Sequence, residues 1–307
     1  IGAGATAFLL ITDLTTGETI VDASRPGPAG PTVSIGDEPG EGLHARYRMP
    51  GTTFEISRDA GSNEARLHIS MTDTLGVFPG LHSLPGISSL PGVAALPTGT
   101  RQPQVEVELT LESGVAPAIT AINELAGSPA MAHATVKHAA LATWGTVTVR
   151  GPGGPNVYSL DNGLGGIDYT NAALPRQTQR KWASANGRLA DGTPFALNLV
   201  SEFSGLEGPI AENAVWLNGA LIPVTQDVSI VSNESAPDVG WHIRAVDGSV
   251  HLRFVPVAQH DERIGLAVIG GTKRQPVGHF TGHVVLDGKR HDVDGVPGLV
   301  ESLDVTW

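Results

Sequence analysis

Between residues 165 and 219 the chain places several polar side chains among aromatic ones. Asp168 lies next to Tyr169 in this stretch, and Trp182 and Trp216 follow. If Asp168 faces a nonpolar pocket, the loss of hydration favours its protonated form, which is fit to act as a general acid. Protonation of an alkene creates a carbocation, which the faces of these aromatic rings could stabilise. Water or an internal nucleophile would then complete a hydration or a cyclisation.

The alternative for Asp168 is a structural carboxylate that accepts turn amides or pairs with Arg176. Arg176, Arg180 and Lys181 form the densest basic patch of an acidic chain. In an extended run Arg176 and Arg180 share one face, and Lys181 lies on the other. One of these residues, with Arg176 as the candidate, could bind a carboxylate or phosphate of a substrate bidentately. Pairing with nearby carboxylates that holds strands together is the alternative.

A second carboxylate, Glu212, has the same strand parity as Trp216, so we expect the two side chains on one aromatic-lined face. Asn213 points to the other face and is a candidate for contacting the substrate. Beside Asp168, Glu212 could serve as a second acid or base, because paired groups in different environments can divide these duties.

Polar residues also interrupt apolar runs elsewhere. Asn198 is either a hydrogen-bond donor in the pocket or a partner of a strand or turn backbone. His138 is a candidate for acid–base work, although a lone histidine in a strand is usually structural. His279 and His283 have the i, i+4 spacing of helical zinc ligands. In a strand they would be about 13 Å apart, too far to share one ion.

Other familiar enzyme signatures are absent from the sequence. It contains no GxSxG elbow, no P-loop and no strand–GxGxxG–helix fingerprint. It also contains no cysteine, which excludes disulfides, thiolate nucleophiles and cysteine-ligated zinc or iron–sulfur clusters. We therefore predict no organic cofactor and no metal.

Composition narrows the possible partners. A net charge of −12 argues against nucleic acid, because phosphate binding needs a basic face. No apolar run approaches the roughly 18 residues that span a bilayer, so we predict no transmembrane segment.

The chain begins at Ile1 without methionine, which is compatible with the loss of a leader or an N-terminal segment. The oligomeric state and the compartment stay open, with the cytoplasm favoured.

Turn residues between alternating runs predict a mostly β protein with few short helices. Phe54 and Ile56 are expected to pair with Leu67 and Ile69 of the next strand, across a turn. Residues 104–111 alternate apolar and polar side chains, as in a strand with one buried face. Asp-Gly or Asn-Gly dipeptides, the strongest short-range hairpin signal, lie at residues 191–192, 218–219, 247–248 and 287–288.

Two segments depart from this pattern. Residues 116–127 are the one fair helix candidate, and the segment is short. Residues 78–98 form a six-residue quasi-repeat built on Leu-Pro-Gly, which predicts an irregular loop because proline and glycine weaken both helix and strand. We interpret this loop either as a lid over a nonpolar ligand or as a surface excursion that packs on its own barrel.

Several ordered motifs resemble the DUF2804 family, a domain of unknown function. They lie at residues 136–149, 167–187, 194–200, 212–219, 241–256 and 278–307, so the resemblance covers roughly residues 130–307. That family is distantly similar to lipocalin-like proteins that include carotenoid 1,2-hydratase and fungal Diels–Alderases. The resemblance implies two antiparallel β-barrel or barrel-like halves, with a ligand site at or near their junction. It also implies that Asp168 corresponds to an aspartate that supplies acid chemistry.

From this resemblance we expect an N-terminal domain over residues 1–130 and a C-terminal domain over residues 131–307. The favoured function is a cofactor-independent hydratase, dehydratase or cyclase that acts by acid catalysis on a hydrophobic small molecule, such as a terpenoid, polyene or polyketide. The alternative is a lipocalin-like protein that binds such a molecule without changing it. A third possibility is a glycan enzyme with two catalytic carboxylates, for which the sequence has no sugar-platform pattern.

Overall fold

The computed structural model describes residues 4–37, 40–72, 104–114, 117–151, 153–206, 210–232, 240–266 and 269–306. All regular structure in these residues is antiparallel β-strand, and no helix occurs among them. The described part of the chain therefore has no helix that could span a membrane. The Leu-Pro-Gly segment at residues 78–98 lies outside the described residues.

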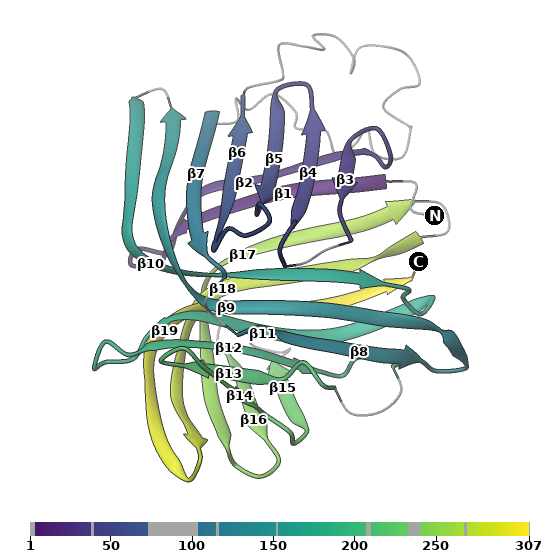
Figure 1. Cartoon of the computed structure of the whole chain (residues 1–307), viewed down its shortest axis with the longest axis vertical. Coiled ribbons are helices and arrows are strands. Elements are labelled where there is room, and N and C mark those ends of the chain that lie inside the picture. The colour runs from purple at the N-terminus through teal and green to yellow at the C-terminus, as the bar shows by residue number, and fades with distance from the viewer. Residues whose placement is uncertain are drawn as a thin grey trace.

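The strands form one hairpin and two larger sheets (Figure 1). The hairpin consists of β1 (Gly4–Asp13) and β2 (Glu18–Pro28). The N-terminal sheet has the order β10-β9-β7-β6-β5-β4-β3, and β8 also pairs with β9. Its strands are β3 (Val33–Ile35), β4 (His44–Met49), β5 (Thr52–Ser57), β6 (Glu64–Met71), β7 (Gln104–Glu112), β8 (Ile119–Leu125), β9 (Ser128–Gly151) and β10 (Gly154–Ala172).

The C-terminal sheet curls into a half-barrel with the order β14-β13-β12-β11-β19-β18-β17-β16-β15. Its strands are β11 (Gln177–Arg188), β12 (Pro194–Ser201), β13 (Ala214–Leu217), β14 (Ala220–Pro223), β15 (Val228–Ser232), β16 (Trp241–Ala245), β17 (Val250–Leu266), β18 (Ile269–Leu286) and β19 (Lys289–Thr306). Its concave face encloses the largest apolar core, with Phe195, Phe254 and Phe280 fully buried. The predicted mostly β architecture with two barrel-like halves is confirmed.

The local register follows the sequence pattern. Phe54 lies opposite Ile69 and Ile56 opposite Leu67, as the alternation predicted. The four dipeptide turns also occur, but in two forms. At Asn218 and Asp287 both the residue and the glycine after it have positive φ, as a type I′ turn requires. At residues 191–192 and 247–248 only the glycine does, and the aspartate accepts a hydrogen bond from the amide two residues on.

The helix expected at residues 116–127 is wrong, because residues 119–125 form strand β8. Ala121, Asn123 and Leu125 are buried, whereas Thr120, Ile122 and Glu124 are exposed, so the segment has a period of two. The backbone of β8 pairs with the first half of β9, and this pairing overrides the helical preference of its alanine and leucine residues.

Strands β9 and β10 form a long bent ribbon that links the two halves (Figure 1). The second half of β9 pairs with β7 in the N-terminal sheet, and its first half, with β8, packs over β11 and β12. The bend lies near Ala140, which has positive φ, and Gly145, where a Cβ atom would meet the carbonyl oxygen of Glu108. The ribbon therefore carries side chains from the N-terminal sheet onto the convex face of the half-barrel.

The β1–β2 hairpin forms a second link between the halves. Val21 and Ala23 join Met71 and Val105 in the core of the N-terminal sheet. Asp22 alternates with these residues and contacts β17 of the C-terminal sheet. The junction thus has a ribbon side, formed by β9 and β10, and a hairpin side, formed by β1 and β2.

The domain division between residues 130 and 131 stays a prediction. These residues lie within β9, and the change from the N-terminal to the C-terminal sheet occurs between β10 and β11.

Candidate active site at the junction of the two halves

A buried lysine joins the two predicted catalytic carboxylates on the ribbon side of the junction. The Nζ atom of Lys137 in β9 lies 2.6 Å from Oδ1 of Asp168 and 3.3 Å from Oε2 of Glu212. The Lys137 side chain is 6% exposed and that of Glu212 2%, whereas that of Asp168 is 33% exposed. Asp168 is therefore the member of this triad that a ligand can reach from solvent.

The strand pairing explains how these groups meet. Lys137 and Asp168 are register partners on β9 and β10, so their side chains leave the ribbon on the same face. Glu212 directly precedes the segment that leads into β13 of the half-barrel. The triad thus connects the two halves, and removal of its cation would leave a buried carboxylate uncompensated.

Trp182 and Asn198 hold the triad in place through hydrogen bonds and a ring contact. Trp182 Nε1 donates a 2.7 Å hydrogen bond to Asn198 Oδ1, and Asn198 Nδ2 donates a 2.8 Å bond to the carbonyl oxygen of Glu212. Lys137 Nζ lies 5.5 Å from the centre of the Trp182 ring, within the range of a cation–π contact. Asn198 therefore bonds both to a side chain of the site and to backbone. We call these five residues the Lys137 cluster: Lys137, Asp168, Trp182, Asn198 and Glu212.

His133 lies on the same face of β9 as Lys137 and is fully buried. Its ring meets Phe203 edge-on, with 4.9 Å between centroids. Neither ring nitrogen has a hydrogen-bond partner among the described residues. Burial lowers the pKa of His133, and the Glu212 carboxylate opposes this shift. The imidazole is thus held in its neutral form, with one donor and one acceptor unused.

Sequence reasoning missed Lys137 and His133, although the pattern of the strand contained a signal for them. Residues 133, 135, 137 and 139 are buried, and they alternate with less buried neighbours. The predicted acid–base residue His138 follows Lys137 and therefore points to the opposite face of β9. Burial lowers the pKa of His138 there, with a further contribution from the positive charge of Arg58.

Tyr169 also faces away from the Lys137 cluster. Its hydroxyl donates a 3.0 Å hydrogen bond to the carbonyl oxygen of Gly36, near β3. Because neighbouring residues of a strand alternate, Asp168 and Tyr169 cannot share one pocket face. Arg176 is exposed in the segment before β11, and Asp168 pairs with Lys137.

Trp216 and Asn213 are both buried outside the cluster. Trp216 Nε1 donates a 2.8 Å bond to the carbonyl oxygen of Pro117, and its ring packs in the core between ribbon and half-barrel. Asn213 accepts a hydrogen bond from the amide of Val200 and donates one to its carbonyl oxygen. These contacts give both residues structural partners.

The two other basic residues of the patch pair with carboxylates from opposite faces of β11. Arg180 binds Glu301 at 2.8 Å, and Lys181 binds Glu202 at 2.8 Å. Lys273 approaches Glu301 at 3.5 Å from the other side. These pairs match the expectation that such residues hold strands together.

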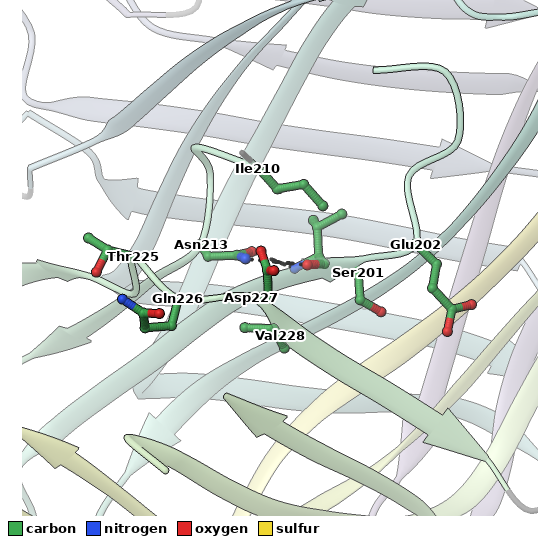
Figure 2. Close-up of a pocket in the computed structure, with 9 residues that line it drawn as sticks. Ser201, Glu202, Ile210, Asn213, Thr225, Gln226, Asp227 and Val228 are labelled. Carbon is green, nitrogen blue, oxygen red and sulfur yellow. Dashed lines mark hydrogen bonds between the residues drawn. The ribbon is translucent and has the colours of Figure 1, made fainter. Parts of the chain in front are cut away.

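Asn213 lines a separate cavity of about 140 Å³ at one end of the half-barrel (Figure 2). Thr225, Gln226 and Asp227 give it a mainly polar, exposed rim. Its lining residues are Val200, Ser201, Glu202, Ile210, Asn213, Thr225, Gln226, Asp227 and Val228. A nonpolar ligand would find little matching surface there.

One group of side chains among the described residues has metal-ligand spacing. His68, Glu106 and Glu108 lie on the outer face of the N-terminal sheet, with His68 Nδ1 2.6 Å from a Glu108 oxygen. His279 and His283 lie in strand β18, as predicted. None of these groups contacts the Lys137 cluster in the described part of the chain.

A family model for a domain of unknown function, DUF2804, matches residues 1–307. The chain therefore belongs to the DUF2804 family, and the match includes the first 130 residues, which the sequence motifs left outside the resemblance. No curated protein has a significant match to the sequence.

Several solved structures are similar to the chain at low sequence identity. CghA bound to Sch210972 is 11% identical with a TM-score of 0.48, over 99% of this chain and 85% of that one. A Nitrosomonas europaea protein provisionally assigned as AttH is 14% identical with a TM-score of 0.47, over 99% and 81%. Kievitone hydratase from Nectria haematococca is 9% identical with a TM-score of 0.35, over 85% and 83%.

Proposed function

We propose that the chain is an enzyme that adds or removes water, or closes a ring, on a nonpolar small molecule by acid catalysis at the Lys137 cluster. The observation that supports this most is the convergence of Asp168 and Glu212 on Lys137, beside the Trp182 ring, where the two halves meet. No organic cofactor is part of the proposal.

We infer the role of each group in the proposed reaction from its burial. Asp168 is one-third exposed and 2.6 Å from Lys137, so the proton between them is the one offered to the substrate. Glu212 is almost fully enclosed and positions the ammonium group. With all three groups ionised the triad carries one excess negative charge, which would stabilise a positive charge developing on the substrate.

In a hydration, the alkene carbon takes the proton from the Lys137–Asp168 pair and its neighbour becomes cationic. Water then attacks the cationic carbon and gives up a proton to the Lys137–Asp168 pair, so the cluster returns to its starting protonation state. In a cyclisation, an internal nucleophile takes the place of water. The Trp182 face supplies aromatic surface beside the reacting carbon.

A non-catalytic binding protein is the second candidate. The enclosure of Lys137 and Glu212 favours it, because buried ion pairs of this kind also occur as structural links between elements. In that case the cluster would hold the ribbon on the half-barrel, and the ligand would be retained unchanged.

The test is incubation of the protein with a nonpolar metabolite extract in D₂O, followed by untargeted mass spectrometry of free and protein-bound fractions. Wild type, Asp168→Asn and the control Asp161→Asn are compared; Asp161 is an exposed residue of the same strand that accepts a bond from Ser159. We expect a compound that gains deuterium or the mass of water with wild type and Asp161→Asn, and not with Asp168→Asn. Compounds retained unchanged and equally by all three proteins would contradict the enzyme and support the binding protein.

A further inference from the structure

A buried histidine meets two carboxylates on the hairpin side of the junction, away from the Lys137 cluster. His260 in β17 is 3% exposed. Its Nδ1 lies 2.6 Å from Oδ1 of Asp22 in β2, and its Nε2 lies 3.7 Å from Oε1 of Glu262. Asp22 belongs to the β1–β2 hairpin and His260 to the C-terminal sheet, so this contact crosses the junction.

Neighbouring side chains hold the His260 ring in place. Phe8 of β1 stacks on it with centroids 4.8 Å apart and planes 4° from parallel. Ser24 of β2 donates a long 3.5 Å bond to Glu262. The hairpin thus contributes Phe8, Asp22 and Ser24 to one contact surface.

A second histidine contacts the turn of the same hairpin. His279 Nε2 lies 3.1 Å from the carbonyl oxygen of Leu14, and its Nδ1 lies 3.2 Å from the carbonyl oxygen of Gly295. Both ring nitrogens therefore face acceptors. A neutral imidazole has one N–H and can satisfy one of them, whereas a protonated imidazole donates to both.

The same reasoning applies to His260. When neutral it donates from Nδ1 to Asp22 and leaves the Nε2 lone pair toward Glu262; Nε2 makes no hydrogen bond within the described residues. When protonated it attracts both carboxylates. Each histidine therefore needs a second proton to donate to both of its acceptors. One acceptor of each histidine belongs to the hairpin: Asp22 for His260 and the Leu14 carbonyl for His279.

Other charged groups also lie at this surface. Lys273 of β18 lies over the Phe8 ring at 4.4 Å and pairs with Glu301, which also binds Arg180. Lysine, arginine and carboxylate groups ordinarily keep their charge over this range, whereas imidazole titrates within it.

We propose that His260 and His279 form a proton-dependent clasp that fixes the β1–β2 hairpin on the C-terminal half. Protonation of the clasp strengthens the contacts to Asp22 and to the Leu14 carbonyl. A neutral imidazole contacts them more weakly. The clasp thereby adjusts how firmly the two halves dock, and it does so independently of any reaction at the Lys137 cluster.

Amide hydrogen exchange at pH 5.5 and 8.0, corrected for the intrinsic rate and expressed relative to strand β12, measures this docking. In wild type we expect the protection of residues 4–28 to be about tenfold higher at pH 5.5 than at pH 8.0, since each neutral imidazole keeps one donated hydrogen bond and lacks the second that protonation supplies. In His260→Gln/His279→Gln the protection should be low at both pH values. The control His251→Gln, an exposed histidine of the same strand β17, should behave as wild type.

Equal protection of residues 4–28 at both pH values in wild type would overturn the clasp. So would an unchanged pH dependence in the double variant. If the double variant loses protection in β12 as well, the single variant His279→Gln is measured instead, because it removes only a partly exposed contact. Protection of residues 4–28 that depends on pH as strongly in His279→Gln as in wild type would contradict the proposal.

Discussion

On each side of the junction a basic side chain lies between two carboxylates, but the basic residue differs. On the ribbon side, Lys137 lies between Asp168 and Glu212; on the hairpin side, His260 lies between Asp22 and Glu262. In both places one acceptor comes from each half of the molecule. Lysine keeps its charge across the physiological range and histidine does not. The ribbon side should therefore be a constant link and the hairpin side an adjustable one.

The largest expected effect tests the constant link. Lys137→Met leaves the Glu212 carboxylate buried without its cation, which should lower the free energy of unfolding by about 3–5 kcal/mol. The loss should be the same at pH 6 and pH 8, measured by urea denaturation. Lys181→Met, which breaks the more exposed pair with Glu202, should cost about 0–1 kcal/mol. Similar losses in both variants would contradict the burial argument.

The second prediction sharpens the same comparison through a rescue. Glu212→Gln added to Lys137→Met removes the uncompensated charge and should recover at least half of the lost stability. The measurement is a double-mutant cycle by urea denaturation. Additive losses would show that Lys137 and Glu212 do not interact.

The third prediction concerns the adjustable link. His260→Gln removes a charge-assisted contact to Asp22 and should lower the free energy of unfolding by about 1–3 kcal/mol at pH 6. The loss should be smaller at pH 8 than at pH 6, because a neutral imidazole gives the Asp22 carboxylate a weaker hydrogen bond than a protonated one. A loss that is as large at pH 8 as at pH 6 would make the two sides of the junction equivalent.

The smallest effect at neutral pH is expected at His133. Burial lowers its folded-state pKa, so the unfolded chain takes up the proton first as pH falls. Wild type should therefore lose stability relative to His133→Phe below about pH 6.5, and the two should differ by less than about 1 kcal/mol at pH 8. Thermal unfolding at pH 5 and pH 8 measures both. A phenylalanine variant that is less stable at both pH values would indicate a hydrogen-bonded histidine.

The sequence predicted the parts of the fold that depend on short-range pattern. The register of Phe54 with Ile69 follows from one turn between two alternating runs. The sequence also singles out Asp168 and Glu212, because both carboxylates lie in the stretch that sets polar groups among aromatic ones and could divide acid and base duties. The segment at residues 116–127 was assigned as helix because its composition hid the period of two that pairing with β9 reveals.

What the sequence did not predict depends on contacts between distant strands. Lys137 meets Asp168 through the register of a long ribbon, and Glu212 through packing of that ribbon on another sheet. Nothing local specifies either contact. Strand parity, however, would have separated Tyr169 from Asp168 and His138 from Lys137, since neighbours in a strand face opposite sides.

The most direct test of the central claim asks whether a small molecule binds beside the Lys137 cluster. Trp182 would be replaced by the photoreactive p-benzoylphenylalanine, and Trp144, an exposed residue of the same ribbon, would carry it in the control. After incubation with a nonpolar extract and irradiation, intact-protein mass spectrometry should show a small-molecule adduct at position 182 and not at position 144. An adduct at both positions alike, or none at position 182, would contradict a ligand site at the junction.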